Sequence, residues 1–342
     1  DIDRVNGMYG KYLLDLEDLA KENDYEATAN AGLMAACRDA GGGTLKTIPY
    51  QPNVFAFFYN KDLFEQAGIT EEPKTWDEFK DVCQKLKDAG IGTYILFQET
   101  YHKESYETLH PTGPKHNYAY HTEAMDRAME GGIDDVGLGV LFGLEGYQYE
   151  FAGLLMHAEH LEAVHGVGPH TISVPRIKHA DDIDPNVFDN SLSDELFAKI
   201  IACIRIAVPY TGMIISTRES ETIRGKVLDY GISQISGASR TSVGGYTEKE
   251  RPHDSEQFDV SDQRTLDEVV RWLMELDHIP SFCTACYREG RTGDRFMSLC
   301  KNGQILNCCH PNALMTLTEF LVDYASCLLY TSDAADDRIS VD

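Results

Sequence analysis

The stretches DDVGLGVLF (134–142), EFAGLLMHAEHLEAVH (150–165) and HTISVPR (170–176) are predicted to form a strand, a helix and a second strand. Both strands are short apolar runs, and the segment between them has the length and apolar spacing of a helix. Strands are also predicted at 92–97, 211–217 and 231–236, with helices at 121–131, 194–207 and 220–229. This alternation predicts an α/β fold with a parallel sheet. Five strands do not close a (β/α)8 barrel, so we expect a partial barrel of about five βα units.

Polar side chains follow the predicted strands, where a buried strand would otherwise stay apolar. They are Gln98, Glu99 and Thr100, then Ser173 and Arg176, then Ser216, Thr217 and Arg218, and finally Ser233 and Ser236. Because the active sites of such barrels lie at the carboxyl ends of the strands, these residues predict the rim of a site. The Ser and Thr side chains could instead cap helices. The guanidinium groups of Arg176 and Arg218 suit a carboxylate ligand, although each could instead form an internal salt bridge.

The composition is strongly acidic. The 342 residues include 30 Lys and Arg against 56 Asp and Glu, which gives a formal net charge of −26. This charge argues against binding to nucleic acid or to an anionic membrane, so a small-molecule partner is expected. No apolar run in the sequence approaches the roughly 20 residues that cross a bilayer. The nine cysteines are odd in number and concentrated late in the chain. They indicate a cytoplasmic protein with a metal site rather than a secreted disulfide framework.

Three thiols near the end of the chain have a spacing suited to metal chemistry. Cys283 and Cys286 form a CxxC motif, and Cys309 follows after an intervening segment. Three soft thiolates can hold an iron–sulfur cluster and leave one iron open to another ligand. A CxxC pair can equally be a redox dithiol. With Cys300, Cys308 or His310 the same thiols could form a closed zinc site, and spacing alone does not choose among the three.

Several long stretches of the chain carry a resemblance to one family. They are GIGTYILFQETYH (90–102), HTEAMDRAMEGGIDDVGLGVLFGL (121–144), GVGPHTISVPRI (166–177), AVPYTGMIISTRES (207–220), ISQISGASRTSVGGY (232–246), QFDVSDQRTLDEVV (257–270) and IPSFCTACYREGRTGDRFMSL (279–299). From about residue 85 to 326 the chain resembles the tyrosine-cleaving radical S-adenosylmethionine lyases that mature FeFe-hydrogenases. These lyases are grouped with 2-iminoacetate synthase and the biotin-synthase-like enzymes.

The resemblance implies a reaction and its cofactors. Such enzymes cleave S-adenosylmethionine at a first 4Fe–4S cluster, and the resulting radical splits tyrosine into p-cresol and dehydroglycine. A second 4Fe–4S cluster, in the C-terminal region, converts dehydroglycine into carbon monoxide and cyanide for the hydrogenase H-cluster. Cys283, Cys286 and Cys309 match the ligands of this second cluster, which favours iron–sulfur among the three alternatives. Tyrosine, other hydrogenase maturation proteins and an electron donor are the partners implied.

The resemblance also implies roles for residues of the rim and the barrel. Arg218 and Ser233 match positions that hold the carboxylate of the amino acid. The glycines Gly137, Gly139 and Gly143 resemble a strand that lets the backbone approach adenosine, and Gln98, Glu99 and Arg176 are grouped with them as cofactor-binding residues. His157 matches a ligand of an extra iron beside the second cluster, and its alternative role is an ordinary histidine on a helix surface.

One departure from the family is an absence. The first cluster needs a C-x3-C-x2-C loop, and the cysteines before the late group are Cys37, Cys83 and Cys203. No such triplet can be formed from them. We therefore expect this chain to be unable to start the radical step.

The first part of the chain has a second resemblance. The stretch TIPYQPNVFAFFYNKDLFEQAGITEEPKTWDEFKDVCQKLKDAGI (47–91) resembles the solute-binding proteins of carbohydrate ABC importers, with Tyr50, Gln51 and Asn53 as candidate sugar contacts. The two resemblances overlap at 85–91, where we expect a chimeric join. The alternative function is accordingly a carbohydrate-binding lobe fused to unrelated sequence.

The two resemblances divide the chain into four predicted parts. These are a solute-binding fragment at 1–84, a partial radical S-adenosylmethionine barrel at 85–250, a cluster region at 251–326 and a tail at 327–342. The tail resembles translated sequencing adapter, so we expect it to be non-native.

Overall fold

The computed structural model describes most of the chain. The described residues are 12–48, 61–75, 78, 81–82, 85–86, 93–113, 115–179, 187–188, 190–242, 245–246 and 259–326. The chain divides into two compact units, Asp1–Lys61 and Asp62–Asp342. The join predicted near 84–92 lies mostly outside the described residues, so it stays a prediction. Tyr50, Gln51 and Asn53 also lie outside them.

The described part of the N-terminal unit contains three short helices, α2 (Glu17–Glu22), α3 (Tyr25–Thr28) and α4 (Ala31–Ala40). The side chain of Asn30 caps α4 by accepting from the N–H groups of its first turn. Met34 and Cys37 on the inner face of α4 pack with Ala20 and Leu45 in a small core. Arg38 Nε donates to Glu17 Oε1 at 2.8 Å and ties α4 to α2. The following helix, α5 (Lys61–Gln66), begins at the sequence boundary between the units.

The second unit is built on a sheet of five parallel strands. In order across the sheet they are β1 (Tyr94–Ile95), β2 (Val136–Gly139), β3 (Thr171–Ser173), β4 (Gly212–Ile215) and β5 (Gln234–Ile235). Each pair of neighbours is parallel, with Gly137 level with Thr171 and Ile172 level with Met213. All five strands lie within the ranges predicted from the sequence. The predicted α/β class and partial barrel are confirmed.

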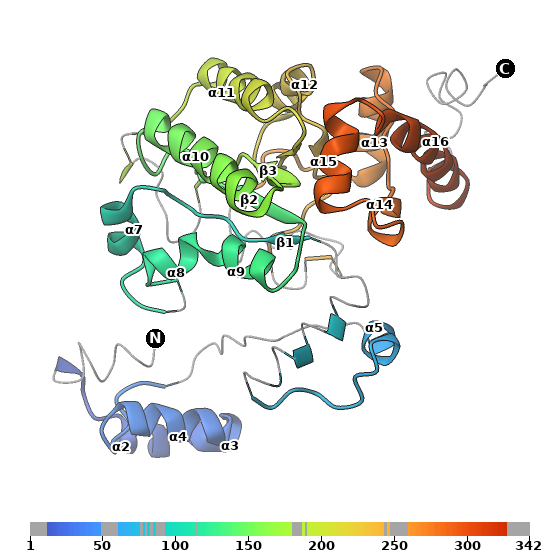
Figure 1. The fold of residues 1–342 in the computed structure, drawn as a ribbon. Helices are drawn as coiled ribbons and strands as arrows, with labels where there is room; N and C mark the ends of the chain where they lie inside the picture. Colours follow the sequence, from blue (N-terminus) through green and yellow to red (C-terminus); the bar gives the residue numbers. More distant parts are fainter. Residues whose placement is uncertain are drawn as a thin grey trace. The chain divides into compact units, whose positions relative to one another are not determined.

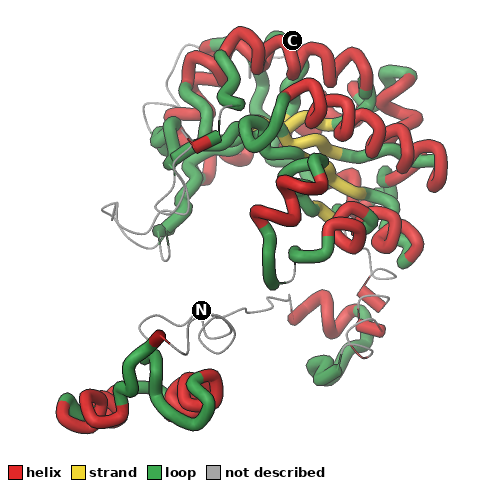
Figure 2. Tube along the Cα trace, turned by 90° about the vertical axis from the view of Figure 1, so that its left-hand side faces the viewer, coloured by secondary structure: helices red, strands yellow, loops and turns green. Residues whose placement is uncertain are grey.

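Helices connect successive strands and cover the outer side of the sheet (Figures 1 and 2). The connections contain α7 (Lys103–Leu109), α8 (Tyr118–Thr122) and α9 (Ala124–Glu130), then α10 (Tyr147–His165), α11 (Asp194–Ala207) and α12 (Glu221–Leu228). The helix predicted at 121–131 is thus two helices that meet at Glu123. Ser193 and Ser220 cap α11 and α12 by accepting from backbone N–H groups. These caps fix where each helix starts after its strand.

The main core lies between the sheet and these helices. Val136, Leu138 and Val140 are fully or almost fully buried, at alternate positions of β2 and its continuation, and pack in one cluster with Leu154 of α10 and Ile201 of α11. Burying one such side chain contributes about 1.5–3 kcal/mol relative to leaving it exposed. The apolar alternation of the strand therefore fixes which face of the sheet meets the helices.

Four helices form the C-terminal part, drawn in orange to red in Figure 1. They are α13 (Leu266–Glu275), α14 (Ala285–Arg288), α15 (Gly293–Lys301) and α16 (Leu306–Asp323). Thr265 and Glu268 form a capping box at the start of α13. Val270 and Met274 of α13 pack against Leu317 and Leu321 of α16. None of the helices in the described ranges is long and apolar enough to span a membrane.

Candidate functional site: a strand-end rim and a group of thiols

Gln98 and Glu99 stand where β1 ends and the chain turns toward α7. Gln98 is buried, and its Nε2 donates to Thr122 Oγ1 at 2.9 Å. Glu99 has a positive φ of 67°, which is uncommon for a residue with a side chain, and its carboxylate pairs with Lys115. Both side chains therefore have partners within the protein. Their predicted contact with the cofactor stays a prediction.

Arg176 forms an internal ion pair. Its Nε donates to Glu219 Oε1 at 3.0 Å, its Nη2 donates to Asp194 Oδ1 at 2.8 Å, and its side chain is 9% exposed. Burial alone would lower the pKa of this guanidinium, but the carboxylates of Glu219 and Asp194 raise the pKa above its ordinary value. The salt bridge that the sequence left open as an alternative is present. Arg176 thus joins the end of β3 to the start of α11 and to the loop after β4.

The other arginine of the predicted rim, Arg218, lies in the loop after β4. It is half-buried after β4, and its backbone N–H donates to Ser216 Oγ at 3.1 Å. Burial lowers the pKa of its guanidinium, while the carboxylates of Glu99 and Glu219 act in the opposite direction. Glu99 follows β1 and Arg218 follows β4, so charges from strands that are not neighbours influence one another. The site at this rim stays a prediction.

Ser233 lies nearer the amino ends of the strands than Arg218 does. Its Oγ accepts from the backbone N–H of Met213 at 3.0 Å, and its own N–H donates to Met213 O at 3.1 Å. Ser233 is therefore level with Met213, which precedes Arg218 by five positions. A strand rises roughly 3.3 Å per residue, so the register argues against both side chains holding one carboxylate. That joint role stays a prediction.

The three glycines are required by packing. A Cβ added at Gly137 would lie 2.7 Å from the side chains of Ile95 and Thr171, and one at Gly139 would lie 2.6 Å from the ring of Phe97. Gly143 has a φ of +111°, which side chains rarely tolerate. Neighbouring side chains already explain all three positions. The predicted approach of adenosine to them is not tested by these contacts.

The late cysteines gather in the C-terminal part. Cys283 precedes α14, Cys286 lies within it, and Cys309 lies in the first turn of α16. Burial raises the pKa of the Cys309 thiol, and the nearby thiols of Cys286 and Cys283 raise it further. Burial, together with Cys309 and Cys286, raises the pKa of Cys300 to about 11. The thiols of Cys283, Cys286, Cys300 and Cys309 thus lie close enough to influence one another's pKa, as Cys308 does that of Cys309, and their role as ligands stays a prediction.

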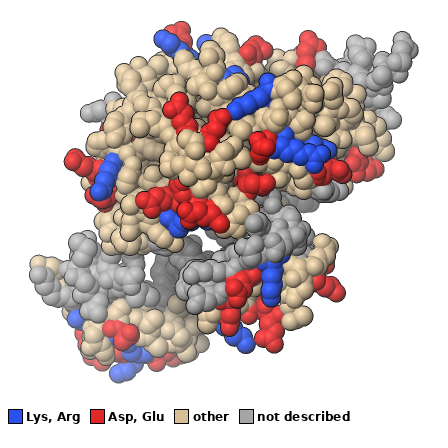
Figure 3. All heavy atoms as spheres, in the orientation of Figure 1, with Lys and Arg blue, Asp and Glu red and all other residues tan. Residues whose placement is uncertain are grey.

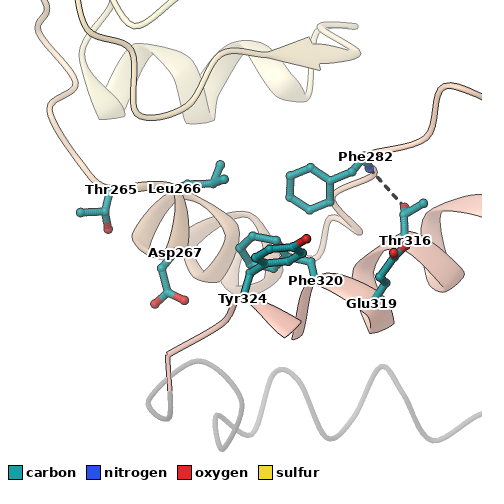
Figure 4. Close-up of a pocket in the computed structure, with 8 residues that line it drawn as sticks. All are labelled: Thr265, Leu266, Asp267, Phe282, Thr316, Glu319, Phe320 and Tyr324. Carbon is teal, nitrogen blue, oxygen red and sulfur yellow. Dashed lines mark hydrogen bonds between the residues drawn. The ribbon is translucent and has the colours of Figure 1, made fainter. Parts of the chain in front are cut away.

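An aromatic hollow lies between α13 and α16 (Figure 4). Contacts between its lining residues set the position of the segment with Cys283 relative to the helix with Cys309. Phe282, the residue before Cys283, stacks on Phe320 with 4.8 Å between ring centroids. Its backbone N–H donates to Thr316 Oγ1 at 3.2 Å. Thr316 and Phe320 belong to α16, the helix that carries Cys309. The hollow therefore docks the CxxC segment onto the helix of the third thiol.

Within the described residues, no group of three His, Cys, Asp or Glu side chains is placed to hold a metal ion. Which group the late thiols hold therefore stays a prediction. The pKa of the Arg291 guanidinium is raised above its ordinary value, chiefly by the nearby Cys286 thiol. Arg291 thus supplies a positive charge beside the thiols.

The thiol segment is held at the amino ends of the strands. Asp135, just before β2, accepts from the backbone N–H of Gly293 at 2.8 Å. Thr93, just before β1, shares a hydrogen bond with Tyr287, with 2.8 Å between the two hydroxyls. The rim lies at the carboxyl ends, so the thiols and the rim occupy opposite ends of the sheet.

His157 has no contact with the thiols among the interactions of the described residues. Its Nδ1 lies 3.0 Å from Tyr101 Oη, and the two rings meet edge to face. Burial lowers its pKa from 6.5 to about 4, with Asp126 and His160 as the nearest charged groups. These contacts give no support to the predicted role as an iron ligand, which stays a prediction.

His170 is the imidazole beside the thiol segment, and sequence reasoning missed it. Its ring centroid lies 4.1 Å from that of Phe296 and 6.1 Å from that of Tyr287, the neighbour of Cys286. Its Nδ1 lies 3.1 Å from Asp135 Oδ2. The signal that could have identified His170 in the sequence is a histidine at the amino end of a predicted strand, opposite the rim.

Comparisons with known proteins separate the two parts of the chain. The model of the Biotin and Thiamin Synthesis associated domain matches residues 173–279. The 2-iminoacetate synthase of Escherichia coli K12 is 27% identical over 271 residues, which are 76% of this chain and 66% of that protein. A crystal structure of HydG, a maturase of the [FeFe]-hydrogenase, has a TM-score of 0.71 and 55% identity, covering 76% of this chain and 56% of HydG.

Most of the chain is related to the radical S-adenosylmethionine enzymes. HydG from Carboxydothermus hydrogenoformans supports this with a TM-score of 0.62 and 40% identity over 76% of this chain and 55% of that one. The resemblance expected from the sequence is confirmed, together with the class of cofactors, S-adenosylmethionine and a 4Fe–4S cluster. The chain spans 66% or less of the radical S-adenosylmethionine relatives that it matches.

The first part of the chain has other relatives. The model of the bacterial extracellular solute-binding protein matches residues 4–119. The sn-glycerol-3-phosphate-binding periplasmic protein UgpB of Salmonella typhi is 42% identical over 55 residues, which are 16% of this chain and 13% of UgpB. The predicted second resemblance is confirmed. The matched range continues beyond the expected join into residues that form β1 and α7.

Proposed function

We propose that residues 85–326 are the C-terminal part of a radical S-adenosylmethionine tyrosine lyase that serves hydrogenase maturation. The observation that carries this proposal is the similarity to HydG, with a TM-score of 0.71 and 55% identity over 76% of this chain. The effect of Cys283 and Cys286 on the pKa of Cys309 supports the three thiols as the ligand set. In the complete reaction tyrosine is cleaved to p-cresol and dehydroglycine, and carbon monoxide and cyanide are the final products. The location proposed is the cytoplasm, with other maturation proteins and an electron donor as partners.

The residues of this chain support two separate steps. At the rim, the half-buried Arg218 offers a guanidinium for the carboxylate of tyrosine, in an environment where burial strengthens a charge pair. At the other end, the three thiolates hold a 4Fe–4S cluster, which supplies one iron open to a further ligand. Arg291 offsets the negative charge of the thiolates, and Asp135 and Tyr287 fix the segment that carries them.

We also propose that this chain does not start the reaction by itself. Its sequence contains no C-x3-C-x2-C triplet, so no loop of this chain can hold the first cluster in the manner of the family. Anaerobic incubation with S-adenosylmethionine, tyrosine and a reductant should release no 5′-deoxyadenosine and no p-cresol above background. Turnover would show that another set of ligands supports that cluster.

The thiol site is tested by its metal content. After anaerobic reconstitution with iron and sulfide, the chain should bind about one 4Fe–4S cluster, measured by iron and sulfide analysis. Stoichiometric zinc with no sulfide would instead establish the closed zinc site. Retention of the cluster after all three of Cys283, Cys286 and Cys309 are changed to serine would refute the ligand assignment.

A second candidate function belongs to the first part of the chain. The match to solute-binding proteins over 4–119 and the similarity to UgpB favour a binding lobe for a carbohydrate or a phosphorylated polyol. Isothermal titration of the full chain with sn-glycerol 3-phosphate tests this role. Saturable binding would support the lobe, and its absence up to millimolar ligand would leave residues 1–84 without a binding role for this compound.

A further inference from the structure

We propose that a hollow among the helices on the outer side of the sheet binds a small uncharged aromatic molecule whose oxygen accepts a hydrogen bond, as that of a phenol does. The inference goes beyond the proposed function, because it concerns neither the thiols nor the strand-end rim. Three observations carry it: an aromatic lining, a buried imidazole nitrogen without a partner, and carboxylates that are already paired.

The hollow lies where α8 and α9 meet α10, and we call it the α10 hollow (Figure 1). Its volume is about 470 Å³, within the range of roughly 300–1,000 Å³ that small-molecule sites have. Tyr101, Tyr118 and Tyr149 contribute aromatic rings to its lining, and Met156 contributes a thioether. Tyr149 is 54% exposed and Met156 is 69% exposed, so the hollow opens to solvent. All of its lining lies in the described ranges 93–113 and 115–179.

Tyr101 forms a fixed floor of the hollow. Its backbone N–H donates to Glu150 Oε2 at 2.8 Å, and its carbonyl oxygen accepts from Tyr118 Oη at 2.7 Å. Gly153 of α10 lets the ring of Tyr101 lie against the helix, since a Cβ there would lie 2.5 Å from Tyr101 Cγ. A rigid aromatic surface loses little conformational freedom on binding, which favours a small planar ligand.

The second observation is the imidazole of His157, which also lines the hollow. Within the described residues its Nε2 is buried without a hydrogen-bond partner, and its Nδ1 lies 3.0 Å from Tyr101 Oη. Tyr101 Oη makes no other hydrogen bond in these residues, so its proton points to Nδ1. Burial lowers the pKa of His157 to about 4, so at neutral pH the ring is uncharged and its proton is on Nε2. A buried donor without an acceptor is costly, and the oxygen of a ligand would satisfy it.

A ligand must displace a side chain to reach Nε2 of His157, because this atom is covered. Met156 is the neighbour of His157 in α10 and belongs to the same lining. Methionine is unbranched and flexible, so its side chain can adjust around a ligand. The hollow therefore combines a fixed aromatic floor with an adaptable edge.

The third observation concerns the carboxylates of the lining. Asp126 Oδ1 lies 2.8 Å from His160 Nε2 and 3.0 Å from His165 Nε2, and Glu123 Oε2 lies 4.0 Å from Arg127 Nη1. Figure 3 shows a similar mixing of basic with acidic side chains on the face of the second unit that it presents. A cationic ligand would gain little from paired carboxylates and would also lie beside the unpaired N–H. An anionic ligand would be repelled by them, so an uncharged ligand is expected.

The test uses the full chain without added metal and four probes, each titrated at neutral pH with ligand-observed NMR. Phenol has the ring and the acceptor, toluene has the ring alone, and benzoate and benzylamine carry opposite charges. We expect phenol to bind at one site, at least about fivefold more tightly than each of the others. Equal or tighter binding of another probe would overturn the proposal. No saturation by phenol up to about 10 mM, the weak end for a ligand of this size, would also overturn it.

Variants locate the bound probe. Ala152 is an exposed residue of the lining, so Ala152→Phe should fill the hollow and abolish phenol binding. Ala207→Phe, at the exposed last residue of α11, is the matched control and should leave binding unchanged. Phenol binding that survives Ala152→Phe, or that is lost equally in Ala207→Phe, would place the probe elsewhere and refute the proposal.

Variants of His157 test the hydrogen bond. His157→Phe removes the donor, so phenol should bind about tenfold more weakly and toluene about as before, whereas His157→Gln keeps an N–H and should retain most of the affinity for phenol. Equal losses in the two variants would contradict a bond to Nε2. If neither variant folds, the preference for phenol over toluene and the effect of Ala152→Phe decide the question. Iron(II) alone, titrated in place of phenol, should not bind at His157, and iron binding that His157→Gln abolishes would overturn the proposal.

Discussion

Asp135 caps a helix that begins 158 positions later in the chain. Its Oδ1 accepts from the backbone N–H of Gly293 at 2.8 Å, at the start of α15, and its Oδ2 lies 3.1 Å from His170 Nδ1. One carboxylate at the amino end of β2 therefore fixes the first turn of α15 and lies beside the imidazole of His170, just before the next strand. Gly293 has a φ of +50°, and a Cβ there would lie 2.9 Å from Asp134, so this close approach needs glycine.

Removing this cap should loosen the C-terminal part from the sheet. We expect Asp135→Ala to lower the free energy of unfolding by about 1–3 kcal/mol, because it removes a helix cap and leaves a buried N–H unpaired. Asp134→Ala is the matched control, since the hydrogen bond of Asp134 with Thr292, at 3.1 Å, is exposed. Urea unfolding gives the free energies, and limited proteolysis shows whether residues 281–301 become more accessible. Equal effects of the two substitutions would contradict the role of the cap.

The sequence predicts the strands well because each is a short apolar run with clear breaks around it. It misses the break at Glu123, where one predicted helix is two, because apolar spacing continues across the boundary between α8 and α9. The partner of Arg176 is also beyond sequence reasoning. Glu219 lies 43 positions away and meets Arg176 only once β3 and β4 are side by side.

The C-terminal site, too, is only partly predictable from the sequence. The spacing of Cys283, Cys286 and Cys309 is visible in the sequence, and in the structure the thiols of Cys283 and Cys286 raise the pKa of Cys309. His170 is not recognisable there, because its position beside Tyr287 depends on how the C-terminal part packs under the sheet. The spacing of nearby residues can be read from the sequence, whereas contacts between distant segments depend on the whole fold.

The thiols should differ in their importance for the cluster. Serine at Cys283, Cys286 or Cys309 should abolish the cluster, because a hydroxyl is a poorer ligand for iron in this setting than a thiolate. Cys308→Ser is the matched control, since Cys308 is a free thiol of the same group and has no assigned role. Iron and sulfide analysis after reconstitution decides this. Loss of the cluster in the Cys308 variant with retention in the Cys309 variant would reverse the assignment.

Substitutions of the two arginines of the rim should distinguish an effect on stability from an effect on tyrosine binding. Arg176→Met should destabilise the fold by up to about 3–5 kcal/mol, because among the ion pairs of the described residues it leaves the buried carboxylate of Glu219 with only the longer contact to Lys178 Nζ at 3.7 Å. Arg218→Met should remove tyrosine binding, because the guanidinium is the proposed anchor of the carboxylate. Unfolding in urea and calorimetric titration with tyrosine provide the two readouts. Tyrosine binding that survives in Arg218→Met would exclude this residue as the carboxylate anchor.

A double substitution gives a further test of the ion pair between Arg176 and Glu219. Replacing both partners, as in Arg176→Met with Glu219→Leu, should recover most of the lost stability, since no buried charge is then left unpaired. If the double variant is as unstable as Arg176→Met alone, the loss comes from packing of the guanidinium on Phe197 rather than from the ion pair. The guanidinium carbon lies 4.4 Å from the centre of that ring.

The partly buried ring of His157 should make stability depend on pH. Burial lowers its pKa from 6.5 to about 4. Between these values the unfolded chain binds more protons at this site than the folded chain does, so stability rises with pH there. The contribution of neutral His157 is therefore complete above about pH 6.5 and is lost as the pH falls toward about 4. Because the ring is only partly buried, we expect the change to be about 1–2 kcal/mol.

This dependence is measured by unfolding the chain in urea at about pH 7 and about pH 4.5. His157→Gln cannot be protonated and can still bond to Tyr101, so the difference in stability between the two pH values should shrink by the contribution of His157. His116→Gln is the control, because His116 is exposed and should leave the difference unchanged. An equal difference in the chain with and without His157 would show that a group other than His157 governs the response to acid.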